Sequence, residues 1–64
     1  MKTLCYYIER NSEYNKFLVT LDFVATSIPC FVSLVDVEMG YVELTVLCRE
    51  ADALFVQTSL SPFV

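Results

Sequence analysis

The segment from Cys30 to Glu50 constrains the fold most strongly, because two strand-like runs flank a turn at the only glycine of the chain, Gly40. After this turn, apolar and polar residues alternate. One face carries Val42, Leu44, Val46 and Cys48, and the other carries Tyr41, Glu43, Thr45 and Arg49. A period of two in a run rich in β-branched residues is typical of a strand with one buried face. The run before the turn is apolar on both faces. We therefore predict a β-hairpin, with Gly40 supplying a positive φ in the turn.

The first half of the chain predicts a strand followed by a helix. Residues 2–9 alternate between Leu4, Tyr6 and Ile8 on one face and Thr3, Cys5 and Tyr7 on the other, as in a strand. Asn11 or Ser12 can then cap a helix. Apolar residues recur at helical spacing from there on, at Tyr14, Phe17, Leu18, Leu21, Val24 and Ala25. The helix should end at residues 27–29, because a residue before proline avoids the α region.

The tail, residues 51–64, fits either a helix or a strand. A helical face would hold Ala51, Leu54, Phe55 and Thr58, and a strand face would hold Leu54, Val56, Thr58 and Leu60. Glu50 and Asp52 lie just ahead of the apolar run and favour a helix that begins near Glu50. Pro62 ends either element, and a short strand over residues 60–64 is a further alternative.

The order of these elements predicts the fold class. It is α+β, with a βαββ unit and a short C-terminal helix or strand. The hairpin returns the third strand beside the first, which gives a small antiparallel sheet in the order 1-3-2 with one helix packed on one face. This is a truncated ferredoxin-like arrangement. Residues 1–64 are expected to form one small domain, of a size that is marginally stable alone.

Three short segments carry a resemblance to a known type of domain. Tyr7-Ile8-Glu9-Arg10, Lys16-Phe17-Leu18 and Gly40-Tyr41-Val42-Glu43-Leu44 resemble landmarks of short bacterial βαββα domains of unknown function. The resemblance extends over the strand–helix–hairpin part of the chain. It departs from that type at Ile28-Pro29-Cys30 and in the tail, where a charged amphipathic helix would be expected. It implies the fold and no particular activity.

Charge and residue usage disfavour several classes of function. The chain has four basic and eight acidic residues, a net charge of −4. The basic residues are scattered and lie near acids, so nucleic-acid binding through a basic patch is not expected. Histidine, the commonest general base and metal ligand, is absent. No phosphate-binding glycine loop or metal-type cysteine spacing occurs. We therefore predict a non-enzyme with no cofactor, no metal and no catalytic residue.

Three cysteines, Cys5, Cys30 and Cys48, are expected to be reduced thiols of a cytoplasmic protein. Their odd number and an N-terminus without a signal-peptide pattern favour this interpretation. Cys30 follows Pro29 at the start of a strand and could act as a nucleophile, but no neighbouring cation is visible that would lower its pKa. Cys48 is in register with core positions, and Cys5 is expected to be the most accessible. A thiol-dependent activity at Cys30 or Cys5 is an alternative function.

Acidic residues around the hairpin are candidate ligands for a cation. Asp36 and Glu38, or Glu43 across the hairpin, could share a face and bind a cation. Charges at such positions more often keep a strand edge soluble, and we favour that interpretation.

A membrane-spanning segment over residues 17–35 is another alternative. This stretch carries one charge, Asp22, and nearly reaches the length that spans a bilayer. However, a charge at the centre of a spanning helix costs about 2.5–3.5 kcal/mol. Pro29 and the period-two pattern also fit a turn and a strand better.

The outward strand faces provide the candidate functional surface. The nine aromatic residues are more than one small core can hold. Tyr7, Tyr41 and Leu47 fall on outward faces, Cys5 lies beside them, and no helix covers this side of the predicted sheet. Exposed apolar patches mark interaction surfaces. We predict a non-catalytic protein–protein interaction or regulatory module, which binds a protein partner or forms a homo-oligomer through the uncovered face or through the edge of the first strand.

Overall fold

The computed structural model describes all 64 residues and has the element order β-α-β-β-α. The elements are β1 (Lys2–Glu9), α1 (Tyr14–Ser27), β2 (Cys30–Asp36), β3 (Tyr41–Cys48) and α2 (Ala53–Leu60), with single 3-10 turns at Glu50–Asp52 and Ser61–Phe63. The predicted α+β class is confirmed.

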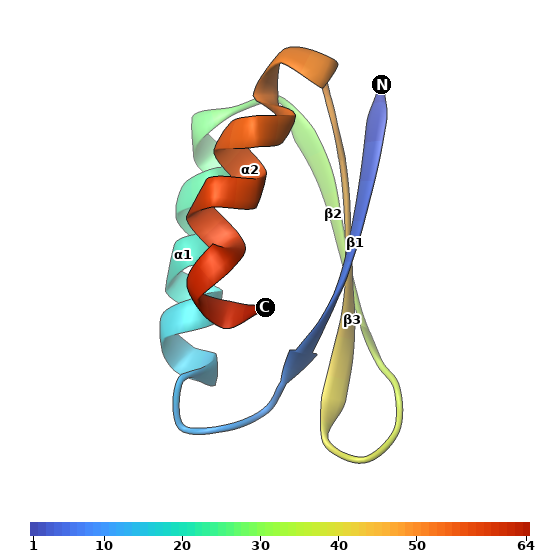
Figure 1. Ribbon diagram of the computed structural model, residues 1–64, viewed down its shortest axis with the longest axis vertical. Helices are drawn as coiled ribbons and strands as arrows, with labels where there is room; N and C mark the ends of the chain where they lie inside the picture. Colours follow the sequence, from blue (N-terminus) through green and yellow to red (C-terminus); the bar gives the residue numbers. More distant parts are fainter.

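The three strands form one antiparallel sheet in the order β1-β3-β2, which confirms the predicted 1-3-2 order. β3 is central: its Val46 lies opposite Leu4 of β1 and Val32 of β2. Both helices lie on the same side of this sheet, and no helix covers the other side (Figure 1). The molecule therefore has two layers and one bare sheet face.

The hydrophobic core lies between the helices and the sheet. The alternation predicted for β3 is confirmed, since Val42, Leu44, Val46 and Cys48 are at most 1% exposed. The main cluster joins residues of β1 and β3 to both helices and consists of Leu4, Ile8, Phe17, Leu21, Val24, Leu44, Val46, Cys48, Ala53, Val56 and Leu60. The buried stripe of α1 is narrower than predicted: Leu18 and Ala25, on its flank, are exposed. The reason is that only the positions spaced i, i+4, i+7 face the sheet directly.

α1 starts later than the predicted cap. The helix begins at Tyr14, and Glu13 occupies the capping position without a side-chain hydrogen bond. Asn11 instead organises the preceding turn, because its Oδ1 accepts a hydrogen bond of 2.9 Å from the Glu13 N–H. The predicted end is confirmed: α1 stops at Ser27, and Ile28 is extended ahead of Pro29.

The hairpin turn has positive φ at two residues. Gly40 has a φ of 77°, as the sequence predicts, but Met39 also has a φ of 61°. The Tyr41 N–H donates to the Glu38 carbonyl at 3.2 Å and closes the turn. Two successive positive φ values are typical of a type I′ turn, which matches the twist of the flanking strands. Met39 therefore occupies a position where asparagine or glycine would be favoured.

The tail is helical, as the acidic residues ahead of it indicate. The strand alternative for residues 51–64 is wrong, and so is the short strand over 60–64, because Ser61–Phe63 forms a 3-10 turn. This turn places the Phe63 ring 5.8 Å from the ring of Phe17, in an edge-to-face arrangement. Packing against α1 thus replaces strand pairing at the end of the chain.

The stretch considered as a membrane span is divided between two elements. Within residues 17–35, α1 ends at Ser27 and β2 begins at Cys30. No helix of the protein has the length and apolar character needed to cross a membrane. Residues 17–35 therefore do not form one continuous helix in this structure.

Candidate interaction surface

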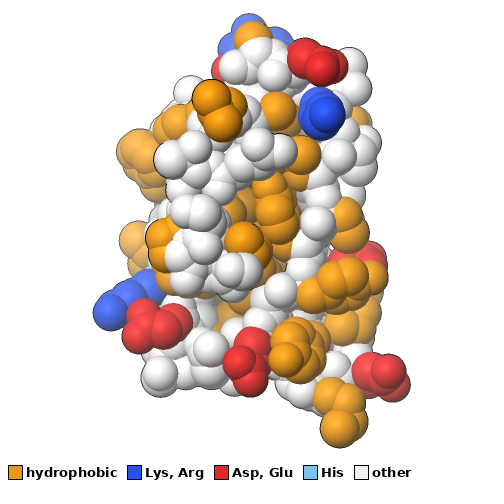
Figure 2. Space-filling model, in the orientation of Figure 1, with side chains coloured by type: hydrophobic (Ala, Val, Ile, Leu, Met, Phe, Trp, Pro, Cys, Tyr) orange, Lys and Arg blue, Asp and Glu red, His pale blue; other side chains and the backbone are white.

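The bare side of the sheet is built from alternate residues of all three strands, and we call it the open face. The strand register arranges these residues in four rows that run from β1 through β3 to β2 or its end. The rows are Thr3–Leu47–Phe31, Cys5–Thr45–Ser33, Tyr7–Glu43–Val35 and Glu9–Tyr41–Val37. The space-filling view shows hydrophobic side chains interspersed with acidic ones toward the turn end of the sheet (Figure 2).

The open face carries large apolar side chains at both ends and small side chains in the middle. At the turn end, Tyr7 is 60% exposed and Tyr41 is 41% exposed. At the other end, Phe31 is 72% exposed beside Leu47. The row between them holds Cys5, Thr45 and Ser33. The register therefore creates two separate apolar areas on this face.

One hydrogen bond links β1 and β3 near the turn end of the open face. The Tyr7 hydroxyl donates to Glu43 Oε2 at 3.0 Å, and the two residues are direct partners in the β1–β3 ladder. This bond, reinforced by the negative charge of Glu43, raises the pKa of Tyr7 above its ordinary value. Tyr7 therefore presents its ring to solvent with its hydroxyl already engaged.

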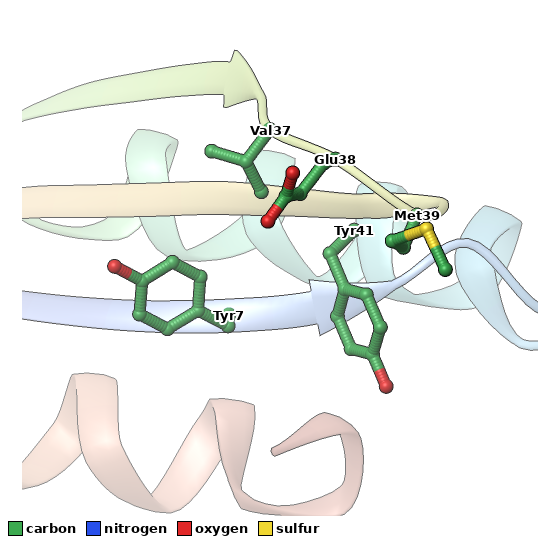
Figure 3. Close-up of a pocket in the computed structure, with 5 residues that line it drawn as sticks. All are labelled: Tyr7, Val37, Glu38, Met39 and Tyr41. Carbon is green, nitrogen blue, oxygen red and sulfur yellow. The ribbon is translucent and has the colours of Figure 1, made fainter.

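The turn end of the open face forms an open hollow. It is lined by Tyr7 from β1, Tyr41 from β3 and three residues of the β2–β3 connection, namely Val37, Glu38 and Met39. The two tyrosine side chains are diagonal neighbours in the ladder, and their rings lie on the same side of the strands (Figure 3). The hollow is thus apolar, with a single carboxylate at its rim.

The structure brings some of the predicted surface residues together and separates another. Tyr7, Tyr41 and Cys5 are exposed on the open face. Leu47 lies on the same face but is half-buried between Thr3 and Phe31, three rows away from Tyr41. It belongs to the other apolar end.

Sequence reasoning missed four exposed apolar residues that belong to this surface. They are Phe31, Val35, Val37 and Met39. The period of two places the first three on one face of their strand. However, that strand is apolar on both faces, so the pattern alone does not indicate which face is open.

The cysteines differ in accessibility as predicted: Cys5 is exposed, Cys30 is half-buried and Cys48 is buried. Burial raises the pKa of Cys30, and the nearby Cys48 and Asp52 add to the increase. A nucleophilic cysteine is activated by a lowered pKa, so the environment of Cys30 acts in the opposite direction.

The three hairpin carboxylates considered for a cation site do not share a face. Asp36 lies on the helix side of the sheet and forms an ion pair with Arg10. Glu43 lies on the open face and accepts the hydrogen bond from Tyr7. No group of three His, Cys, Asp or Glu side chains is placed to hold a metal ion.

The helical layer also exposes apolar side chains. Val19 and Leu54 are each 72% exposed, and the ring of Phe23 lies 6.2 Å from that of Phe55 on the seam between the helices. This second patch lies on the opposite side of the molecule from the open face. It provides control positions for experiments on the sheet.

Comparison with protein-family models, with curated proteins and with solved structures found no match for this chain.

Proposed function

We propose that this protein is a non-catalytic interaction module that acts through its sheet, binding a second copy of itself or another protein. The observation that carries the proposal is the open face, where Tyr7, Tyr41 and Phe31 remain 41–72% exposed. Large apolar side chains gathered on one face of a small domain mark an interaction site. Aromatic residues are also the side chains that contribute most to binding energy in interfaces.

The chemistry of the cysteines supports a non-catalytic role. Cys30 has a raised pKa, and the chain contains no histidine that could activate the exposed Cys5. We assign the protein to the cytoplasm because its three thiols are unpaired. The resemblance to short bacterial βαββα domains agrees with this proposal in fold and adds no activity.

The proposal is tested by measuring molar mass with light scattering over protein concentrations from about 5 to about 500 µM, which bracket a micromolar Kd. Wild type is compared with Tyr41→Lys on the open face and with Val19→Lys on α1 as a matched control. Both replaced side chains are exposed, so neither change should unfold the protein.

We expect the mass of wild type to rise above 7.3 kDa with concentration. If the open face mediates association, Tyr41→Lys should weaken it more than Val19→Lys does. A strictly monomeric wild type would contradict self-association. An association that only Val19→Lys disrupts would move the interaction surface to the helices.

A further inference from the structure

We propose that the free edge of β2 pairs antiparallel with β2 of a second copy, joining the two three-stranded sheets into one, with the two-fold axis at Ser33. This inference rests on the proposed function and deepens it, because it names the partner and the element that binds it.

The backbone groups that face outward from β2 can be assigned from the ladder. The Val37 N–H donates to the Tyr41 carbonyl at 3.1 Å, so odd-numbered residues of this segment direct their hydrogen bonds towards β3. In an antiparallel pair the hydrogen-bonded and non-hydrogen-bonded positions alternate. The N–H and C=O groups of Cys30, Val32, Leu34 and Asp36 therefore point away from β3 to the free edge. They form a complete set of donors and acceptors for another strand.

The edge of β2 lacks the features that normally block strand pairing. Every residue from Phe31 to Asp36 is exposed, and Val32 and Leu34 remain 37% and 40% exposed even on the helix side. Charged side chains, proline, bulges and short length are the usual means of protecting an edge. β2 has seven residues with a single charge, at its end. The other edge strand, β1, is charged at both ends through Lys2 and Glu9.

Strands that are apolar on both faces normally lie in the interior of a sheet, where both faces are covered and both edges are paired. β2 has this composition but lies at an edge in the monomer. Pairing with another strand would place β2 in the interior of the enlarged sheet with both of its edges paired, while its open face stays uncovered.

The sequence of β2 is self-complementary when Ser33 lies opposite Ser33 of the second copy. Val32 then faces Leu34 on the helix side, Phe31 faces Val35 on the open face, and Cys30 faces Asp36 at each end of the pairing. All four outward-facing residues find a hydrogen-bonding partner in this register. If Leu34 lay opposite itself instead, Val32 would face Asp36 and Cys30 would extend beyond the pairing. The register centred on Ser33 therefore uses the whole strand.

The charge distribution also favours this edge over stacking of two open faces. Each copy carries a net charge of −4. Stacking would bury Glu43 together with its hydrogen-bonded Tyr7, and burying a carboxylate is costly. The single charge of β2, Asp36, is already compensated by Arg10. Two acidic copies thus approach at the edge with little repulsion.

The expected dimer is weak. A typical stable interface buries about 800 Å² per partner, which is roughly a fifth of the 4222 Å² surface of this monomer. One strand with its flanking side chains covers less than that. We expect an equilibrium between monomer and dimer in which the mass depends on concentration.

Disulfide trapping tests the position of the two-fold axis. Directly opposite residues of a non-hydrogen-bonded pair have Cα atoms about 4.5 Å apart, which a disulfide can bridge. Ser33→Cys is made together with Cys5→Ser, which removes the exposed native thiol, and is oxidised with glutathione disulfide. The matched control is Thr3→Cys, also combined with Cys5→Ser, on the edge strand β1. We expect the Ser33→Cys protein to form a covalent dimer and the Thr3→Cys protein to remain mainly monomeric.

Opposite charges introduced at Phe31 and Val35 test the register. Phe31→Lys and Val35→Glu should each reduce dimer affinity at least about tenfold, because a charge then faces an apolar side chain across the new pair. The double variant should recover most of the affinity, because lysine and glutamate then face each other between copies. Within one chain these positions are four residues apart along a strand, so the recovery cannot arise inside the monomer.

The outcomes separate this inference from the proposed function. If the Thr3→Cys protein forms the covalent dimer and the Ser33→Cys protein does not, the pairing belongs to β1 and the inference is overturned. A dimer that tolerates both charge variants but is dissociated by Tyr41→Lys would overturn the inference while supporting the open face. A wild-type protein that is monomeric at all concentrations would overturn self-association itself.

Discussion

Replacing Val46 or Val32 by alanine makes the same chemical change on two sides of one ladder pair. The two residues are direct partners on the helix-covered face, but Val46 is fully buried in β3 whereas Val32 in β2 is 37% exposed. Any difference in strand propensity between valine and alanine is similar at both sites. The comparison therefore isolates the effect of burial.

The expected magnitudes follow from these exposures. Valine loses two methyl groups, worth about 1.6 kcal/mol when fully buried, at about 0.8 kcal/mol each. At Val46 a residual cavity adds roughly 1 kcal/mol, so we expect a loss of about 2–3 kcal/mol in the free energy of unfolding. At Val32 about three-fifths of the transfer effect applies and solvent fills the space, so we expect a loss of about 1 kcal/mol. The free energy of unfolding of a domain of this size is about 3–10 kcal/mol, so both variants should still fold.

Urea unfolding followed by circular dichroism measures both changes, provided that the m-value stays constant. The protein is kept at low micromolar concentration so that the monomer dominates. Equal losses at the two sites, or a loss below about 1 kcal/mol for Val46→Ala, would refute the packing described here. At high concentration the loss for Val32→Ala should increase, because pairing of β2 would bury its side chain further.

Other predictions follow from the turn, the tyrosines and the cysteines. Met39→Asn should raise the free energy of unfolding by about 0.5–1 kcal/mol, because asparagine tolerates the positive φ at this exposed site; unchanged stability in urea unfolding would contradict this. Tyr6→Phe should leave stability unchanged or raise it by up to about 1 kcal/mol, because the Tyr6 hydroxyl is buried without a hydrogen-bond partner; a loss above about 1 kcal/mol would reveal a missing partner. The pKa values of Tyr6 and Cys30 are raised by burial, so the folded protein retains protons that the unfolded chain releases. Stability should therefore be constant near neutral pH and fall as the pH rises through the ordinary thiol and phenol range; an increase in that range, in urea unfolding at several pH values, would refute this. A thiol reagent should modify Cys5 first, Cys30 more slowly and Cys48 only on unfolding, and early modification of Cys48, detected by peptide mass spectrometry, would contradict its burial.

The sheet could be predicted from the period-two patterns of β1 and β3, because the helices cover one face of each of these strands. The alternation of β3 identified its buried residues, and the single glycine located the turn. The acidic residues Glu50 and Asp52 correctly favoured a helical tail. These signals are local, so a single sequence contains them.

Features that depend on tertiary packing could not be obtained in this way. The predicted strand order places β2 at an edge, but β2 is apolar on both faces, so its pattern did not indicate which face stays exposed. The ion pair between Arg10 and Asp36 joins the ends of β1 and β2 across the sheet and requires the register to be known. Met39 carries no sequence signal for a positive φ. Its conformation follows from the length of the loop between two fixed strands.

Amide hydrogen exchange of β2 tests the central claim most directly. The N–H groups of Phe31 and Ser33 point towards β3, whereas those of Val32 and Leu34 point to the free edge. We predict that the first two are protected at every concentration and that Val32 and Leu34 become protected only as the mass rises towards the dimer. If Val32 and Leu34 still exchange at the unprotected rate when the protein is dimeric, the edge of β2 is not the interface.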